Sequence, residues 1–507
     1  MSSLIAFLNT LSLHQKVLIG LFVLLKIALI LMVPLTGDEA YFITWGQNLS
    51  LGYYDHPPAV GWVLYAMGQV TDNLVWYRSF AFFSAVLIAY LIYKLVRMDS
   101  RVSQTIAFWV ALAFFVSPIS LMFVVTANDT VLALFSVLGV YFFAKAMHSQ
   151  SWLDVVLAGL FLGLAFLSKY FAAFMLLGLL AYSLWYWKKL NLKQVWLMVA
   201  IVLLAVVENL YFNATHCWNN ILFNFFSRTE ASQFDIGNVL TYIGMIVLLL
   251  SPMGLWYLLK ARNKTTESLN PYLNPIKLVV FASIPLLGIL FLVSLTNAVG
   301  LHWPLISVTL LYVLYLVLSE QQLKRLVTFN AYFSIVAAVI LLVALSMVDQ
   351  LISPSQKHHV AVYTQPEKVC AFLPKDQPFY TLGYSSQSAL AYHCGNDNVH
   401  VFASTSKFGR EDDKLTDFKA LNGKTLTILI THEKDANKVS PFFTSLHVKP
   451  LAINEETTYY LIEGKGFNYG LYRDQVLIPV NEKFYSAPDW FPAITGGCDF
   501  KKKYDFD

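Results

Sequence analysis

Charged residues are scarce in this chain. Only 13% of its 507 residues are Asp, Glu, Lys or Arg, whereas 57% are hydrophobic. A soluble domain carries about twice that charge density, because its surface must stay hydrated. The composition therefore excludes an ordinary soluble enzyme and predicts a membrane protein. The net charge of +4 is small and gives no argument for nucleic-acid binding.

Other features are missing as well. No internal repeat or low-complexity segment is evident, and there are only four cysteines. The first apolar run is followed by Pro34 and an acidic pair, not by the small residues of a signal-peptide cleavage site. We therefore expect the N-terminal run to be a retained membrane helix.

Long apolar runs are abundant up to about residue 348, and the rest of the chain is more polar. The change near Pro354 predicts a transmembrane domain over 1–350 and a second domain over 351–507. A helix needs about 20 residues to cross a hydrocarbon layer of about 30 Å, which gives about 11 candidate spans. They lie near residues 17–35, 77–96, 104–123, 129–147, 153–168, 170–187, 195–212, 238–259, 277–296, 302–319 and 327–348.

The basic residues predict the orientation. They concentrate in alternate connections, which the positive-inside rule places in the cytoplasm. Lys145 and Lys188 then lie on one side, so the run between them must cross twice, with an external turn near Lys169. The N-terminus is predicted to be cytoplasmic, and the C-terminal domain to be periplasmic at a bacterial inner membrane. The cytoplasmic connections hold Lys94, Arg97, Arg101, Lys145, Lys188, Lys189, Lys193, Lys260, Arg262, Lys264, Lys324 and Arg325.

The C-terminal region alternates strand-like runs, such as 399–403 and 425–430, with a helix-like stretch around 385–392. This pattern predicts a small external α/β domain. Cys370 and Cys394 fall in this domain and are candidates for a disulfide in an oxidising compartment. Cys217 and Cys498 are external by the same topology. The sequence leaves the pairing open, including four free thiols.

The first external loop is rich in acidic and aromatic residues. Asp38 and Glu39 are adjacent carboxylates at the mouth of a membrane helix, and Tyr54, Asp55 and His56 precede the rigid pair Pro57-Pro58. An acidic pair alone is explained by helix capping. The stiff polar segment that follows favours a site at the level of the lipid headgroups.

Three further external residues carry charge. Asp129 opens the fourth span, where it is either a cap or a second carboxylate of the Asp38 site, one acting as general base and the other positioning a substrate. Lys169 and Arg228 are basic residues on the side where such residues are few. They pair either with a donor phosphate or with acids such as Glu208 and Glu230.

Together these motifs resemble those of the GT-C membrane glycosyltransferases, in the bacterial branch shared by protein O-mannosyltransferases and the lipid A 4-amino-4-deoxy-L-arabinose transferase. The Tyr-Asp-His-Pro-Pro string is the most specific element, and the resemblance covers most of the membrane domain. The matching segments are Gly37-Asp38-Glu39-Ala40-Tyr41, Tyr53 to Pro58, Thr126-Ala127-Asn128-Asp129, Gly163 to Tyr170, the Asn213/His216/Trp218 segment and His302-Trp303-Pro304.

The resemblance implies a mainly α, polytopic GT-C fold, a polyprenyl-phosphate sugar donor, transfer at the periplasmic face and an external domain above the site. It implies catalytic roles for Asp38, Glu39 and Asp129, and donor-phosphate binding by Lys169. Arg228 is a weaker match, because Glu208-Asn209 and Cys217 depart from the commoner Pro and Gly of that region. The residues expected to bind substrate are Tyr54, Asp55, His56, Tyr170 and His302.

Several alternatives stay open. The acceptor is predicted to be lipid A or another envelope glycolipid, but a protein O-glycosyltransferase uses the same donor. A flippase or transporter of a lipid-linked substrate also needs many spans, but it predicts mid-membrane charges and repeated, broken helices that are not evident here. We expect no required cofactor. A divalent metal remains an alternative, because the acids and His56 are suitable ligands although no spacing demands an ion.

Overall fold

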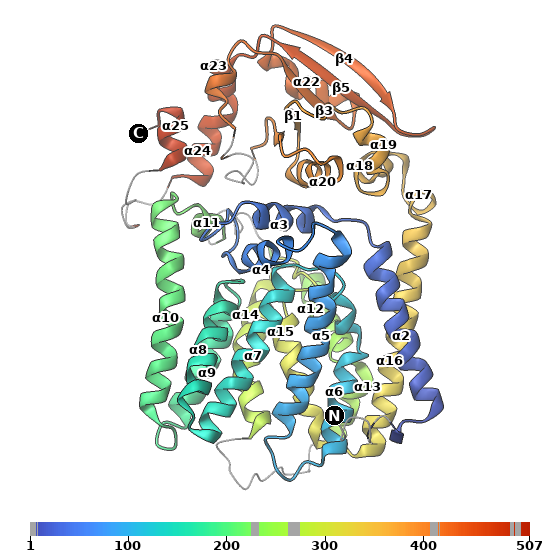
Figure 1. The fold of residues 1–507 in the computed structure, drawn as a ribbon, viewed down its shortest axis with the longest axis vertical. Helices are drawn as coiled ribbons and strands as arrows, with labels where there is room; N and C mark the ends of the chain where they lie inside the picture. Colours follow the sequence, from blue (N-terminus) through green and yellow to red (C-terminus); the bar gives the residue numbers. More distant parts are fainter. Residues whose placement is uncertain are drawn as a thin grey trace. The chain divides into compact units, whose positions relative to one another are not determined.

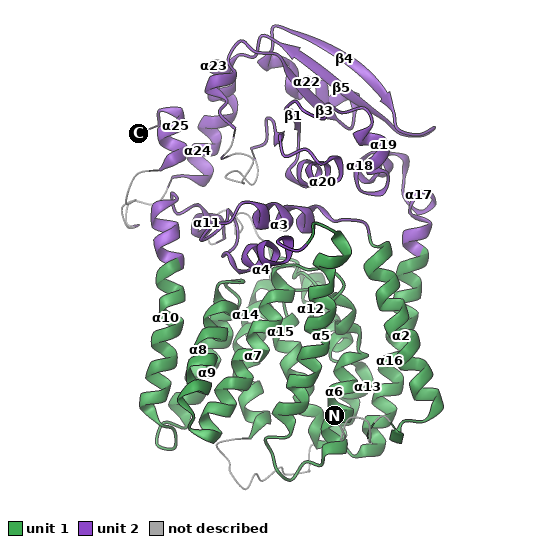
Figure 2. Cartoon of the chain, in the orientation of Figure 1, with its two compact units in different colours: residues 1–33, 71–208, 231–343 green, residues 34–70, 209–230, 344–507 purple. Residues whose placement is uncertain are grey.

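The computed structural model describes residue 7 and residues 9–224, 233–261, 274–405, 414, 416–486, 491 and 498–506. The chain divides into two compact units, which are coloured separately in Figure 2. Unit 1 comprises residues 1–33, 71–208 and 231–343, and unit 2 comprises residues 34–70, 209–230 and 344–507. Two segments from the first half of the chain therefore belong to the same unit as the C-terminal region, whereas the sequence predicted one division near Pro354.

Unit 1 is a bundle of helices (Figure 1). Within the described residues, six helices are long and apolar enough to cross a membrane, or seven if one bent pair counts as a span. The predicted count of 11 therefore stays a prediction. The long helices are α2 (Leu13–Met32), α5 (Leu74–Val96), α7 (Asn128–Ser149), α10 (Leu192–Thr215), α14 (Pro275–Ser294) and α16 (Glu320–Ser346), and the bent pair is α12 (Ile236–Leu249) with α13 (Pro252–Lys260).

Shorter helices occupy the remaining predicted spans of this unit. Proline explains two of the interruptions, because it lacks an N–H donor and disfavours helix at the residue before it. The run predicted at 104–123 leaves the α-helix before Pro118, and α12 and α13 meet at Ser251-Pro252 with a bend of 82°. The shorter elements are α6 (Gln104–Phe115), η1 (Pro118–Met122), α8 (Trp152–Phe166), α9 (Ala172–Trp185), α15 (Leu305–Leu311) and η3 (Tyr312–Val317).

Two cations inside unit 1 hold helices together. Lys26 of α2 is fully buried, and its Nζ donates to the backbone oxygen of Ser120 at 2.6 Å and to its hydroxyl at 3.0 Å. Four phenylalanine rings lie about the same ammonium at 5.8 to 6.0 Å. Arg78 of α5, also fully buried, donates to the carbonyl oxygens of Ile30 and Val33 at 2.7 Å. Both buried cations thus donate hydrogen bonds to backbone acceptors, which lowers the cost of burying them.

Unit 2 is built on a five-stranded sheet with the strand order β2-β1-β3-β5-β4. β1 is parallel to β2 and β3, whereas β3, β5 and β4 pair antiparallel. The runs that the sequence marks as strand-like contain β2 and β3. The strands are β1 (Phe379–Thr381), β2 (Val399–Val401), β3 (Leu426–Ile430), β4 (Ser445–Ala452) and β5 (Thr458–Lys465).

Helices of unit 2 come from three parts of the chain. One aromatic core contains Tyr54 and Phe223 as well as Phe402 and Tyr472, so residues from the loops at 34–70 and 209–230 share a core with the C-terminal region. The helices are α3 (Gly37–Gln47), α4 (Ala59–Gly68), α11 (Asn219–Leu222), α17 (Val348–Leu351), α18 (Pro354–Thr364), α19 (Pro366–Cys370), α20 (Tyr384–Cys394), α22 (Ala436–Val439), α23 (Tyr469–Tyr472), α24 (Ile478–Phe484) and α25 (Asp499–Tyr504).

Two disulfides reinforce unit 2. Cys370 is bonded to Cys394 with 5.3 Å between the Cα atoms, which is the pair that the sequence favoured. Cys217 is bonded to Cys498 with 4.9 Å between the Cα atoms, across 281 residues of sequence. The pairing that the sequence left open is thus resolved, and all four cysteines are bonded. The second bond joins the segment beside α11 to the residue before α25.

Candidate functional site

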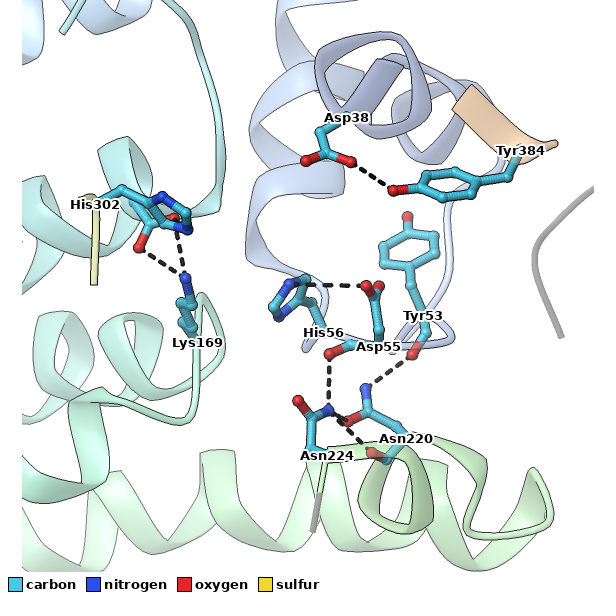
Figure 3. Close-up of polar contacts among 10 residues, drawn as sticks. Asp38, Tyr53, Asp55, His56, Lys169, Asn220, Asn224, His302 and Tyr384 are labelled. Carbon is cyan, nitrogen blue, oxygen red and sulfur yellow. Dashed lines mark hydrogen bonds and ion pairs between the residues drawn. The ribbon is translucent and has the colours of Figure 1, made fainter. Parts of the chain in front are cut away.

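Unit 1 contains a buried ion pair between the start of α7 and the break between α8 and α9 (Figure 3). Asp129 lies in the first turn of α7, and Lys169 lies in the interruption that charge placement predicts there. The Lys169 Nζ donates to both carboxylate oxygens of Asp129, at 2.8 and 3.0 Å. Only 8% of Asp129 and 6% of Lys169 is exposed, so water screens this pair little.

His302 extends the pair. Its Nε2 lies 3.8 Å from the second carboxylate oxygen of Asp129, and its side chain is 48% exposed. Lys169 also lies over the ring of Phe171, at 4.9 Å from the centroid. Asp129, Lys169 and His302, predicted from separate motifs, therefore form one polar cluster. Lys169 takes Asp129 as its partner, and not the Glu208 that the sequence offered as the alternative. Glu230 lies outside the described residues.

The acidic pair of the first loop begins α3 in unit 2. Thr36 caps this helix, since its hydroxyl accepts a hydrogen bond from the Glu39 amide at 3.2 Å. Glu39 is buried and 2% exposed, whereas Asp38 is exposed. The Tyr384 hydroxyl at the start of α20 donates to the Asp38 carboxylate at 2.9 Å (Figure 3). The side-chain cap of α3 is therefore Thr36, while the acidic pair lies in the first turn and Asp38 is an accessible carboxylate.

α20 approaches α3 closely because residue 37 is glycine. A Cβ placed on Gly37 would lie 2.4 Å from the Cβ of Ser385, a separation that no real pair of side chains adopts. The close approach brings Tyr384 over the ring of Tyr41, with the ring centroids 5.5 Å apart. Burial raises the pKa of the nearby Tyr363 hydroxyl, and the negative charge of Asp38 raises it further. Two tyrosine hydroxyls, those of Tyr384 and Tyr363, are thus influenced by or bonded to the Asp38 carboxylate.

The loop after α3 is held by aromatic stacking and by a backbone turn. Tyr53 stacks on Trp45 with the ring centroids 4.3 Å apart, and its hydroxyl donates to the Trp45 carbonyl oxygen at 2.8 Å. The Tyr53 amide donates to the His56 carbonyl oxygen at 3.0 Å. Asp55 and His56 are each 8% exposed, with 3.9 Å between the carboxylate and Nε2. Tyr54 packs on Phe223 at 4.8 Å between centroids.

Two asparagines that the sequence analysis missed fix this loop in place. The side-chain amide of Asn220 donates to the carbonyl oxygen of Tyr53 at 2.8 Å, and that of Asn224 donates to the carbonyl oxygen of Asp55, also at 2.8 Å (Figure 3). Asn220 lies in α11 and Asn224 two residues beyond its end, and the Asn224 side chain also donates to the Asn220 carbonyl oxygen at 3.0 Å. Their i, i+4 spacing was the only local signal, and it did not identify the loop as their partner.

The other predicted residues are placed as follows. Tyr170 is half-buried next to Lys169, and its ring lies 5.8 Å from that of Phe166. Arg228 lies outside the described residues. No group of three or more His, Cys, Asp or Glu residues gathers to hold a metal ion in the described part of the chain. The structure thus presents two clusters, Asp129-Lys169-His302 in unit 1 and Asp38 with the Tyr53 to His56 loop in unit 2. Their convergence in one cavity stays a prediction.

Parts of the chain are similar in sequence to known proteins. Residues 55–212 match the family model described as dolichyl-phosphate-mannose-protein mannosyltransferase. The chain is 24% identical over 262 residues to the lipid A galacturonosyltransferase RgtD of Rhizobium johnstonii. That match covers 48% of this chain and 54% of the relative, so the chain spans about half the length of the curated protein that it matches.

Two crystal structures share the fold over most of the chain. They are ArnT from Cupriavidus metallidurans in the apo state and ArnT bound to undecaprenyl phosphate, at 15% and 14% identity. Each has a TM-score of 0.60 and covers 88% of this chain and 97% of that one. This likeness identifies the fold, which is the one that the sequence motifs predicted.

Proposed function

We propose that the chain is a GT-C class membrane glycosyltransferase, and that it transfers a sugar from a polyprenyl-phosphate donor to lipid A or another envelope glycolipid at the periplasmic face of the inner membrane. The Asp129-Lys169-His302 cluster carries this proposal. This cluster places a cation among apolar helices. Asp129 and Lys169 lie within the residues that match the family model, and His302 comes from a separate motif.

The donor is inferred from the relatives and from the charge of the cluster. The matched family is named for a polyprenyl-type phosphate sugar, and one structure of the same fold was solved with undecaprenyl phosphate. A phosphate on a lipid needs cationic partners near an apolar surface. Lys169 supplies such a cation. The exposed His302 side chain lies next to the same Asp129 carboxylate, with 3.8 Å between its Nε2 and the carboxylate oxygen.

The acceptor is inferred from the curated relative, which is a lipid A galacturonosyltransferase. The proposed face of the membrane is supported by the basic residues in alternate connections and by the two disulfides, since disulfides form in oxidising compartments. The alternative acceptor, a polypeptide, requires the same donor and the same face.

The proposed reaction is a displacement at the anomeric carbon. The acceptor oxygen forms the new bond there while the bond to the polyprenyl phosphate oxygen breaks, and the linkage inverts. Lys169 and Arg228 stabilise the charge of the leaving phosphate. If the acceptor is a hydroxyl, its proton passes to the Asp38 carboxylate. If the acceptor is a phosphate it needs no base, and Asp38 orients the substrate. No cofactor is required by this scheme.

The test of the site is Asp38→Asn, assayed for sugar transfer in purified membranes. Loss of the proposed base or orienting carboxylate should abolish sugar transfer. Because Asp38 is exposed, the substitution should leave membrane insertion and the melting temperature unchanged. Asp474→Asn, an exposed carboxylate in the C-terminal region, is the matched control and should stay active. Normal transfer by Asp38→Asn would overturn the assignment.

A second experiment identifies the substrates. Mass spectrometry of lipid A and of envelope glycoproteins is compared between cells with and without this protein. The proposal expects lipid A or another glycolipid to lose one sugar, whose mass identifies a hexose, hexuronic acid, hexosamine or aminopentose. Loss of a sugar from a protein instead would establish the polypeptide acceptor.

A further inference from the structure

A cavity of about 370 Å³ opens between α2, α13 and α16 of unit 1, away from both clusters described above. The cavity is shallow and broadly open to its surroundings. Met253, Phe329 and Tyr332 supply apolar wall, and Lys324 and Arg325 supply two adjacent cations. The lining of the cavity is thus partly apolar and partly basic.

The two cations differ in their partners. The Lys324 Nζ lies 2.7 Å from the Glu320 carboxylate, one helical turn away, and 5.7 Å from the ring centroid of Trp109. Arg325 is exposed and makes no hydrogen bond or ion pair with any described residue. Lys324 is therefore held in position, while the guanidinium presents five donors for an outside anion.

Large apolar side chains are exposed on helices that line the cavity. Along the same helices, Leu13 and Val17 of α2 and Val336 of α16 are more than half exposed, although they are large and apolar. Such residues on a membrane helix contact acyl chains. Lys324 and Arg325 lie in the first two turns of α16, at the end of the helix that the positive-inside rule assigns to the cytoplasm.

We propose that this cavity binds the headgroup of an anionic phospholipid of the cytoplasmic leaflet. The phosphate contacts Arg325 and Lys324, and the acyl chains lie along the exposed apolar faces of α2 and α16. Basic pockets between membrane helices on this side recognise anionic headgroups, whereas a zwitterionic headgroup gains much less from two cations. The site is separate from sugar transfer and is independent of the proposed function.

The test is lipid retention by the full-length protein, measured by native mass spectrometry from nanodiscs of phosphatidylethanolamine, phosphatidylglycerol and cardiolipin. We expect anionic lipid to be retained over phosphatidylethanolamine by about 30-fold, which corresponds to about 1 kcal/mol for each cation. Lys324→Gln/Arg325→Gln should remove this preference. Lys188→Gln/Lys193→Gln removes two other exposed lysines outside the cavity and should leave it unchanged.

A second variant separates the cavity from surface charge. Thr328→Trp fills the cavity and leaves both cations in place, so it should also reduce retention of anionic lipid. Val339→Trp, on the exposed face of the same helix, is its matched control. Retention that survives Thr328→Trp, equal loss in the Lys188/Lys193 control, or displacement of the bound species by millimolar inorganic phosphate would each overturn the proposal.

Discussion

At the scale of single residues, the main feature is how the charged groups are satisfied. The Lys169 ammonium is already paired, because both carboxylate oxygens of Asp129 accept hydrogen bonds from it. Donor binding by Lys169 therefore requires the phosphate to share this cation with Asp129. The carboxylate gives the buried Lys169 side chain a partner, without which a buried charge would be costly.

Removing one partner of this pair should destabilise the protein. Lys169→Met leaves the buried Asp129 carboxylate without its cation, and we expect a loss of about 3–5 kcal/mol in the free energy of unfolding. Thermal unfolding in detergent measures this loss as a lower midpoint.

The double variant Lys169→Met/Asp129→Leu is the control, since it removes both charges. It should recover most of the stability and remain inactive in sugar transfer. If Lys169→Met unfolds at the wild-type temperature, the pair adds nothing to stability, and Lys169 would be kept for the donor alone.

The hydrogen bond from Tyr384 to Asp38 is predicted to matter for activity. Tyr384→Phe removes the hydroxyl 2.9 Å from the carboxylate and keeps the ring that packs on Tyr41. A hydrogen bond to a charged group contributes about 1.5–3 kcal/mol, so kcat should fall by roughly 10- to 100-fold. Steady-state kinetics separate this fall in kcat from a change in KM.

Tyr460→Phe, in β5, is the matched control and should leave both constants unchanged. A Tyr384→Phe enzyme with wild-type kcat would mean that Asp38 needs no donor from α20. The prediction rests on the proposed role of Asp38, and the Asp38→Asn assay tests that role separately.

At the scale of elements, helix α18 is held to the sheet of unit 2 by histidines. His358 and His359 of α18 meet His432, which follows β3, with 3.4 Å between the Nε2 atoms of His359 and His432. Burial lowers the pKa of His432 below its ordinary value of 6.5, and the positive charges of His358, His359 and Lys434 lower it further. The carboxylate of Asp435 opposes these effects.

This cluster predicts that α18 loosens in acid. Because the folded pKa of His432 is lowered, its contribution to stability is complete above pH 6.5 and is lost as the pH falls through the folded value. Hydrogen exchange of the α18 amides, corrected for intrinsic rates, should rise between pH 7.5 and 5.5.

His432→Gln should flatten this pH dependence, and His447→Gln, an exposed histidine of β4, should not. Exchange in α18 that is independent of pH in the wild-type protein would contradict the prediction.

At the scale of the whole molecule, the disulfides and the charge pattern both predict that unit 2 lies on the periplasmic side of the membrane. All four cysteines belong to unit 2 and all four are bonded. If unit 2 is periplasmic, a thiol probe applied to intact cells should label no cysteine. A membrane-impermeant reductant should then expose all four to the probe.

Single variants provide the control for this labelling. Cys394→Ser should free Cys370 for labelling without reduction, and Cys498→Ser should free Cys217. Labelling of these freed thiols only after the membrane is permeabilised would place unit 2 on the cytoplasmic side and reverse the predicted topology.

Most helices of unit 1 could be predicted from local sequence. Every predicted apolar run overlaps a helix, because helix formation and lipid solvation depend on neighbouring residues. The charges on either side of 155–187 predicted two helices, and the chain does break at Lys169. The bend at Ser251-Pro252 was missed, although proline marks it, because hydropathy averaged over a window is insensitive to a single backbone break.

By itself the sequence determined a mainly helical chain with long apolar helices, and it predicted the GT-C fold and the residues of the candidate site. Only the tertiary structure decided their partners: Lys169 with Asp129, Cys217 with Cys498, and Asn220 with the Tyr53 carbonyl. These contacts join positions 40, 281 and 167 residues apart. Hydropathy and motif spacing report only on near neighbours, whereas partner choice depends on which helices pack together in three dimensions.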